Sequence, residues 1–491
     1  MAALSRLLGL RANERPETAA FIIGADGARL SWRGLAEQAD ALTALSLTRR
    51  LPARARLGIA VADPLAFTAS YLGALAAGLT AVPLDPRLTP AELAANVARL
   101  KVDVLLTDAE PNVDVESWAV TPAGPKLVVP GKGRWPSELA ALRPAVLLAS
   151  SGTTGAPKGI PLSEWQLLAA ARRVARHHRF GPDERGYTPL PLFHVNAQVM
   201  GLLATVVSGS SLVLDRRFEP NEYWARVAQW RPTWLNAVPA ILAALIEQPA
   251  PADIGGIRFA RSASAPLPAS VLSGFAAHTG VSVLETYGMT EAAGQITANP
   301  IDASQRRAGS VGLPVGVGLT VLDAPPGGEG MIALRGRQIV HSYLDLSADG
   351  PERIRPARDA DGWLRTGDLG SRDEAGFVRL AGRSDDVINR GGEKIHPKEI
   401  EDVLLADPRV RSAAVVGAPH ARLGQVAVAF ITARDGSDTE DLRRTLNLLC
   451  ERRLTRYKRP TQIEITSDLP RGPTGKILRR ALRTELAGAA R

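Results

Sequence analysis

Short apolar segments alternate with longer alanine-rich or amphipathic segments through about the first 300 residues of the chain. The apolar segments have the length of buried strands, and the longer ones repeat apolar residues with helical spacing. This alternation is typical of an α/β fold with doubly wound sheets. We therefore predict a helix at 65–77 that ends at Gly78, and strands at 57–61, 80–84, 102–107, 145–149, 187–192, 234–238, 257–260 and 281–284.

After about residue 300 the pattern changes to short strands punctuated by glycine and proline. A small α+β unit is predicted at the end of the chain. With 491 residues the chain is too long for a single core, so we predict two domains, 1–384 and 385–491. The expected elements are strands at 309–314, 330–336, 363–368, 410–416 and 425–432, and helices at 397–405, 438–452 and 475–486.

A loop rich in glycine and hydroxyl side chains follows the strand at 145–149, with the sequence Ser150-Ser151-Gly152-Thr153-Thr154-Gly155-Ala156-Pro157-Lys158-Gly159. Glycines let backbone N–H groups converge on an anion, and hydroxyls and lysine add donors and charge, so the loop suits phosphate. A surface linker is disfavoured, because a helix with a Ser163 and Gln166 capping box follows. The spacing differs from the usual G-x-x-x-x-G-K-[ST] loop.

Several predicted strands run into polar residues at their carboxyl ends. In open α/β sheets ligands bind beyond these ends, so we expect the polar segments to converge on one cleft. The segments are 193–196, 262–266 and 285–291.

The net charge of +9 is concentrated near the end of the chain, where residues 472–491 carry five basic side chains against Glu485. Few aromatic residues accompany this charge and no nucleic-acid module is recognisable, so we expect no nucleic-acid partner. A polyanionic small molecule is the partner that such charge favours.

The seven histidines and the single Cys450 show no metal-ligand spacing, and one cysteine excludes an internal disulfide. We expect a cytoplasmic location and no signal peptide. Two long uncharged stretches, 64–84 and 186–214, are interrupted by glycine, proline and polar residues, so no membrane span is predicted.

Five motifs occur in a fixed order along the chain. Together they resemble the adenylate-forming superfamily of acyl-CoA synthetases, adenylation domains and luciferases. Segments 292–300 and 388–395 resemble most closely the branch of oxalate-CoA and other small-carboxylate-CoA ligases. The motifs are Ser150–Gly159, Tyr287-Gly288-Met289-Thr290-Glu291, Thr366-Gly367-Asp368, Gly382-Arg383-Ser384-Asp385-Asp386 and Pro470-Arg471-Gly472-Pro473-Thr474-Gly475-Lys476.

The resemblance implies a large N-terminal domain of doubly wound sheets with a β-barrel-like subdomain, and a small mobile C-terminal domain. After adenylation the C-terminal domain is expected to rotate about Asp385. The resemblance also implies that Lys476 contacts the acyl carboxylate and α-phosphate, where charge develops during attack. Asp368 and Arg383 are expected at the ribose, and His194 at the acyl pocket. Mg2+ is assigned to Glu291 and Thr154. The phosphates are assigned to the loop around Thr153, Thr154, Gly155 and Lys158, and adenine to Ser264, Ala265, Thr286 and Tyr287. Further cofactor-binding residues are expected at Ser151, Gly152, Gly288 and Thr290.

Each catalytic assignment has a structural alternative. Lys476 could be a solvated lysine at a helix start, and Glu291 a helix-start carboxylate favoured by the dipole. Asp368 could be a turn residue and His194 a core histidine bonded to a backbone carbonyl. The surrounding motifs favour the functional assignment in all four cases.

The implied reaction is ATP-dependent adenylation of a small or medium carboxylate, followed by acyl transfer to the thiol of CoA. After rotation, Gly391, Gly392 and Glu393 are expected to admit the pantetheine arm. Transfer to a carrier protein, and adenylation of an inorganic oxyanion such as nitrite for attack by an aryl amine, stay open as alternatives. The oligomeric state is also open, with a homodimer among the choices.

Two departures from the small-dicarboxylate pattern affect the substrate. Gly294 stands where those ligases usually have a histidine, and Asn196-Ala197-Gln198 replaces a usual His-Gly after His194. Loss of a pocket cation argues against a second carboxylate on the acid, unless Arg306 or Arg307 supplies the charge. A monocarboxylate, or an acid bound by amide side chains, is an equally good expectation.

Overall fold

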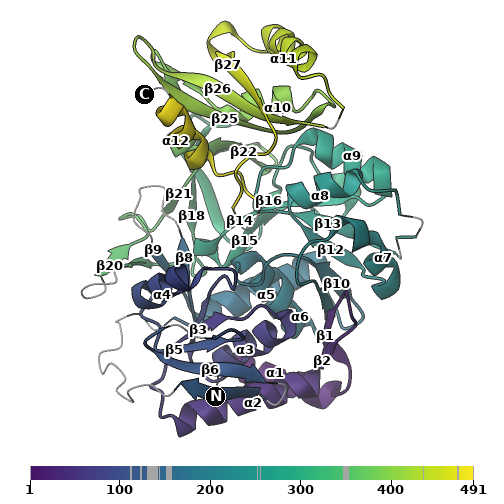
Figure 1. Cartoon of the computed structure of the whole chain (residues 1–491), viewed down its shortest axis with the longest axis vertical. Coiled ribbons are helices and arrows are strands. Elements are labelled where there is room, and N and C mark those ends of the chain that lie inside the picture. The colour runs from purple at the N-terminus through teal and green to yellow at the C-terminus, as the bar shows by residue number, and fades with distance from the viewer. Residues whose placement is uncertain are drawn as a thin grey trace.

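The computed structural model describes residues 2–110, 113–121, 124–129, 142, 144–150, 158–251, 253–254, 256–346, 353–434, 436–472 and 475–489. A large N-terminal domain carries a smaller C-terminal domain on top of it in the view of Figure 1. The fold is mixed α/β, as the alternation of apolar segments predicted.

Two nine-stranded mixed sheets form the large domain. In each, the central strands are parallel and the outer strands antiparallel. The first sheet has the order β20 (Arg353–Pro356), β19 (Ser342–Asp345), β9 (Lys158–Leu162), β8 (Val146–Ser150), β4 (Thr80–Pro83), β3 (Arg56–Ala60), β5 (Val104–Thr107), β6 (Glu116–Thr121) and β7 (Gly124–Val129). The second has the order β16 (Leu313–Pro314), β15 (Gly294–Ala298), β14 (Val283–Met289), β13 (Phe259–Ser262), β12 (Trp234–Ala237), β10 (Arg185–Thr188), β11 (Ser211–Leu214), β1 (Ala19–Ile23) and β2 (Arg29–Ser31).

Helix α3 (Pro64–Ala76) lies between these sheets, since it contacts β3 and β4 of one and β1 of the other. Asp63 caps its first turn, and most of its side chains are buried, which explains the uncharged sequence. Helix α5 (Glu164–His178) begins with the capping box of Ser163 and Gln166, as predicted. The other large-domain helices are α1 (Ala3–Glu14), α2 (Trp32–Thr48), α4 (Pro90–Arg99), α6 (Ala204–Ser208), α7 (Pro220–Trp230), α8 (Pro239–Ile246) and α9 (Ala269–Thr279), with a π-helix at Asn196–Leu203.

The residues expected to form the β-rich subdomain make a four-stranded antiparallel sheet. Its strands are β17 (Gly318–Leu322), β18 (Gly330–Arg335), β21 (Leu364–Arg372) and β22 (Val378–Arg383). The C-terminal domain has a sheet of β24 (Glu393–Ile395), β23 (Ile388–Arg390), β26 (Gly424–Ala433), β25 (Val410–His420) and β27 (Gln462–Thr466), with helices α10 (Pro397–Leu404), α11 (Thr439–Arg453) and α12 (Arg479–Ala489).

The hydrophobic cores of the two domains are separate. The core cluster of the large domain extends along the chain to Val378, and that of the C-terminal sheet begins at Ile388. Between the domains, His396 pairs with Glu329 at 3.1 Å, and Arg434 pairs with Glu247. The domain boundary and the hinge at Asp385 stay predictions.

Several predicted elements have different ends in the structure, and three of these differences lie next to expected site residues. The strand expected at 187–192 stops at Thr188, because Pro189 and Pro191 cannot donate to a ladder. The strand expected at 281–284 continues to Met289 by pairing with β15, so the Tyr287-Gly288 motif is on a strand. Helix α12 begins at Arg479, so Lys476 precedes the helix instead of starting it.

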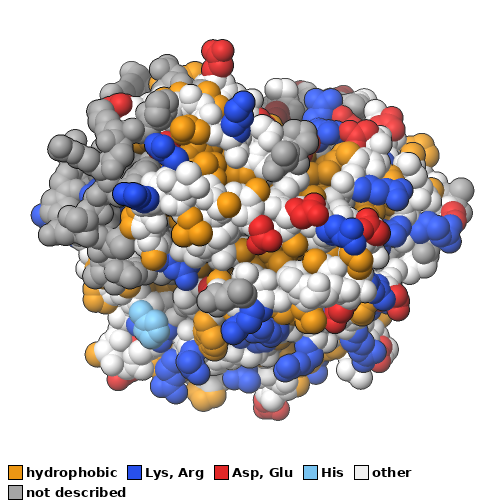
Figure 2. All heavy atoms as spheres, turned by 90° about the horizontal axis from the view of Figure 1, so that it is seen from below, with side chains coloured by type: hydrophobic (Ala, Val, Ile, Leu, Met, Phe, Trp, Pro, Cys, Tyr) orange, Lys and Arg blue, Asp and Glu red, His pale blue; other side chains and the backbone are white. Residues whose placement is uncertain are grey.

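On the face seen from below, basic side chains are spread among acidic and apolar ones and form no single continuous patch (Figure 2). In the part of the chain that the structure describes, no helix is long and apolar enough to cross a membrane. The two uncharged stretches are instead divided among buried helices and strands of the core.

Candidate active site

The lysine of the phosphate-type loop contacts the expected metal ligand. Lys158, at the start of β9, places its Nζ 3.0 Å from Oε1 of Glu291 and 3.8 Å from the ring centre of Tyr343. The hydroxyl of Tyr343 donates to the same Oε1 at 3.2 Å. The other loop residues assigned to phosphate, Ser151, Gly152, Thr153, Thr154 and Gly155, lie outside the described residues.

Glu291 is suited to hold Mg2+ together with a triphosphate. The residue is buried, in a three-residue 3-10 turn, so a helix dipole does not explain its position. Within the described ranges, no group of three or more His, Cys, Asp or Glu side chains could hold a metal by itself. Mg2+ in nucleotide sites commonly uses one or two carboxylates plus phosphate oxygens and water, which a single buried glutamate fits.

Asp368, the last residue of the Thr366-Gly367-Asp368 motif on β21, is the centre of a hydrogen-bonded cluster. Its Oδ2 accepts a hydrogen bond from the hydroxyl of Tyr287 at 2.5 Å, and its Oδ1 accepts one from Arg383 at 3.1 Å. Gly367 has φ +77°, and a Cβ there would lie 2.8 Å from Arg383 Nη2. Glycine is therefore required next to Asp368, and the three side chains expected at the ribose and adenine meet in space.

The residues expected to frame adenine come from the ends of β13 and β14. Ser264 adopts φ +73°, a left-handed conformation that is uncommon outside glycine and clusters at functional sites. Gly288 has no room for a side chain, because a Cβ would lie 2.3 Å from the carbonyl oxygen of Gly294. Ser264, Gly288 and Thr290 border the main cavity, whereas Thr286 is buried and donates to the carbonyl of Ser262 at 3.3 Å. Ala265 follows Ser264 and is half-buried.

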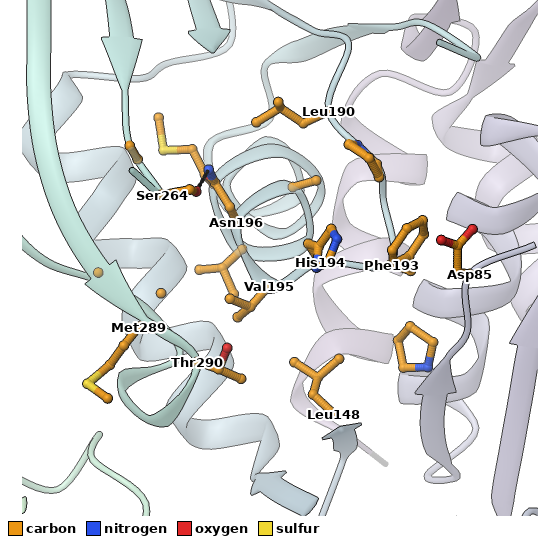
Figure 3. A pocket seen from close by; sticks show the side chains of 18 of the residues that line it. Asp85, Leu148, Leu190, Phe193, His194, Val195, Asn196, Ser264, Met289 and Thr290 are labelled. Atoms are coloured by element: carbon orange, nitrogen blue, oxygen red, sulfur yellow. Dashed lines mark hydrogen bonds between the residues drawn. The ribbon is translucent and has the colours of Figure 1, made fainter. Parts of the chain in front are cut away.

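The main cavity has a volume of about 460 Å3 and lies at the carboxyl ends of these strands. His194 lines it next to Phe193, with ring centres 4.5 Å apart, and Asp85 lies beyond Phe193 (Figure 3). Among the described residues, Nε2 of His194 has no hydrogen-bond partner. Burial lowers the pKa of His194 to about 4, so the imidazole is neutral at physiological pH.

Arg261 is a cavity residue that the sequence reasoning missed. It lies on β13, is 3% exposed, and donates from Nη1 to Oδ1 of Asn196 at 2.9 Å and to Oδ1 of Asn236 at 3.0 Å. A basic residue within an otherwise apolar strand was the available signal. Arg306 and Arg307, which were considered as pocket cations, bond elsewhere: Arg306 to carbonyls such as Ile301 and Arg307 to Asp373.

Lys476 faces the cluster around Asp368. The residue keeps contact with solvent, but the protein packed around its ammonium lowers its pKa by desolvation, and Arg383 lowers it further while Asp368 opposes the shift. A Cβ on Gly475 would lie 3.5 Å from Ala240 of α8, so the segment carrying Lys476 rests on the large domain. The segment after β27 thus places Lys476 near Asp368 and Arg383.

Comparison with known proteins identifies the family of the chain. The family model described as AMP-binding enzyme matches residues 9–344, and the AMP-binding enzyme C-terminal domain matches residues 399–476. The chain belongs to the AMP-binding enzyme family. It is an AMP-forming acid–thiol ligase of the acyl-CoA synthetase type within the adenylate-forming superfamily, as the five motifs predicted.

Relatives of the ligase include the sulfoacetate–CoA ligase of Cupriavidus necator, which is 36% identical over 97% of this chain and 96% of its own length. The oxalate–CoA ligase of Saccharomyces cerevisiae is 33% identical over 71% of this chain and 64% of its own length. Among solved structures, ATP-bound MatB from Rhodopseudomonas palustris has a TM-score of 0.86 at 26% identity, with both chains covered completely.

The two glycines predicted to bind CoA do not border the main cavity. Gly391 and Gly392, with φ +60° and +95°, form the exposed two-residue turn between β23 and β24. Two consecutive positive φ values are typical of a type I′ hairpin, which explains the glycine pair locally. Their part in binding CoA stays a prediction.

Proposed function

We propose that this ligase adenylates a short carboxylic acid and then transfers the acyl group to the thiol of CoA. The observation that carries the proposal is the cavity, which both Ser264 and Gly288 of the adenine frame and acyl-side residues such as His194 border. About 460 Å3 shared between part of a nucleotide and the acid leaves space for a short chain. Sulfoacetate and oxalate, the acids named for two relatives, are of this size.

In the first half-reaction a carboxylate approaches the α-phosphorus of ATP, so two anions must be brought together. Lys476 supplies an ammonium at this point and neutralises charge as it develops in the transition state. Asp368 accepts hydrogen bonds from the ribose hydroxyls, while Tyr287 and Arg383 hold its carboxylate in place. His194 stays neutral and packs against the acyl group.

Glu291 and Thr154 are the residues proposed to hold Mg2+, which when bound neutralises phosphate charge and orients pyrophosphate for departure. The Lys158 ammonium pairs with the Glu291 carboxylate at 3.0 Å. Lys158 therefore has to turn from Glu291 toward the phosphates when the triphosphate enters. The glycine and hydroxyl donors of residues 151–155 complete the phosphate site.

In the second half-reaction the thiol of CoA attacks the carbonyl carbon of the acyl-adenylate from the side that Lys476 occupied, and AMP leaves. Both cannot occupy the same approach, so the C-terminal domain is proposed to rotate about Asp385 and to replace Lys476 by the turn of Gly391 and Gly392. Basic side chains of the C-terminal domain, such as Arg480, are proposed to meet the phosphates of CoA.

The test is pyrophosphate release over a panel of carboxylic acids from two carbons to long chains, measured with and without CoA. We expect release with short acids, and thioester only when CoA is present. Release without thioester, restored by a carrier protein, would favour the carrier-protein alternative. Release with nitrite and an aryl amine, and with no acid, would overturn the proposal.

A further inference from the structure

The main cavity is bordered by a buried positive charge with no negative partner among the described residues. The guanidinium of Arg261 meets only the amide oxygens of Asn196 and Asn236, and both are neutral. Arg226, which is 8% exposed, is paired instead with the carboxylates of Asp215 and Glu219. An uncompensated buried charge costs several kcal/mol, so a ligand anion is the natural partner of Arg261.

The edge of the Arg261 guanidinium formed by Nε and Nη2 makes no hydrogen bond with the described residues. Both amide contacts use Nη1, whereas Nε is buried without a partner and Nη2 makes no hydrogen bond within the described part of the chain. Elsewhere in this protein the same Nε and Nη2 edge binds a carboxylate with two parallel bonds, 2.9 and 2.7 Å long between Arg87 and Asp85. Arg49 and Arg409 hold Glu116 and Asp407 in the same way. The free edge of Arg261 thus matches a planar or threefold oxyanion.

The contacts of Arg261 also fix its neighbours on the cavity wall. Since Oδ1 of Asn196 accepts from Arg261, its Nδ2 is turned toward Ser264, to which it donates at 3.2 Å (Figure 3). Gln295 borders the same cavity, is 5% exposed, and has no partner for either amide atom among the described residues. The cavity therefore offers a cation and unused amide groups on the acyl side.

We infer that Arg261 binds a second anionic group of the acid, so that the substrates are short acids carrying a further carboxylate or sulfonate. The inference rests on the proposed function, in which the reacting carboxylate lies toward Lys476. The second anion then lies against the free edge of Arg261, and the apolar walls of Leu148, Leu190 and Val199 enclose the short chain between them. Arg261 would then supply the positive charge that a histidine usually supplies in small-dicarboxylate ligases, where this chain has Gly294.

The test compares acids of matched length that differ in one charge: acetate against oxalate, propionate against sulfoacetate, and butyrate against succinate. Pyrophosphate release is measured for the wild type, Arg261→Gln, Arg261→Lys, and Arg307→Gln as control. Arg307 is the matched control because it is an arginine considered for the same role, but it pairs with Asp373 instead. We expect the wild type to favour the dianions by at least tenfold in kcat/KM, corresponding to about 1.4 kcal/mol.

In Arg261→Gln that preference falls at least tenfold through a higher KM for dianions, while the monocarboxylates change little. Arg261→Lys keeps part of the preference and Arg307→Gln keeps all of it. A wild type that prefers monocarboxylates, or an equal loss for every acid in Arg261→Gln, overturns the inference but leaves the proposed function intact. If no acid gives pyrophosphate release, the proposed function itself is wrong. If Arg261→Gln does not fold, the wild-type selectivity and Arg261→Lys decide the outcome.

Discussion

The proposed nucleotide site and the main cavity differ in how their buried polar groups are paired. On the nucleotide side, Asp368 has partners for both carboxylate oxygens, and Glu291 meets both Lys158 and Tyr343. On the acyl side, Nε of Arg261 has no partner among the described residues. The same holds there for Nε2 of His194 and both amide atoms of Gln295.

The difference shows where each side obtains its binding energy. A paired and buried cluster is rigid, so it presents the same geometry to the constant ligand, ATP. Unpaired buried groups are costly and are satisfied only by a ligand with the complementary atoms, so they discriminate strongly against acids that lack those atoms. The first arrangement favours preorganisation and the second favours specificity.

The largest effect is expected at Lys476, which lies near Arg383 and Asp368 and is proposed to contact the reacting carboxylate. Lys476→Ala should lower acid-dependent pyrophosphate release by about 10²–10³-fold, because it removes the charge that stabilises the transition state. Thioester formation from a supplied acyl-adenylate should stay near the wild-type rate. Arg480→Ala, on the exposed face of α12, is the control for adenylation. Survival of both half-reactions in Lys476→Ala would contradict its assignment.

The next effect separates the half-reactions at the proposed hinge. Asp385→Pro should leave pyrophosphate release intact and lower thioester formation at least tenfold, because proline fixes φ near −65° and opposes rotation. Both rates are measured on the same preparation. Asp385→Ala keeps the backbone free and serves as control. Wild-type thioester output in the proline variant would argue against a hinge at this residue.

A moderate effect is expected when the paired cluster is broken. Asp368→Asn should raise the KM for ATP about tenfold to a hundredfold, since a charge-assisted hydrogen bond contributes about 1.5–3 kcal/mol. Tyr287→Phe removes only the supporting hydroxyl and should cost less. Steady-state kinetics at saturating acid measures both variants. An unchanged KM for ATP in Asp368→Asn would remove Asp368 from the nucleotide site.

The smallest effect is expected on the pH dependence of the unfolding free energy, through the buried imidazole of His194. Burial lowers the pKa of His194 to about 4, below its ordinary value of 6.5, so the folded state favours the neutral imidazole. That contribution is complete above pH 6.5 and is lost as the pH falls toward 4. Relative to His194→Phe, the wild type should lose about 2 kcal/mol of unfolding free energy between pH 7 and 5. Urea unfolding at both values measures it, and a constant difference would show that His194 is not desolvated.

One cluster of the proposed nucleotide site could be predicted from the sequence, because its residues stand in short contiguous motifs. A glycine beside Asp368, a tyrosine before Gly288 and a lysine after Gly475 are recognisable as short motifs, and the structure brings Asp368, Tyr287 and Arg383 together. The assignments at 151–155 lie outside the described residues and stay predictions.

The acyl side could not be predicted in the same way. Arg261, Arg306 and Arg307 have the same chemistry in the sequence, and the sequence reasoning considered only the last two as pocket cations. Their roles depend on which strand faces the cavity and on whether a carbonyl or a carboxylate lies within reach.

The sequence by itself determined the α/β architecture and the adenylating chemistry, because hydrophobic periodicity and contiguous motifs are local properties of a chain. Only the tertiary structure decided the character of the acyl pocket. Whether a charge is buried and unpaired depends on residues distant in sequence, such as Asn196, Asn236 and Arg261, that long-range strand pairing brings together.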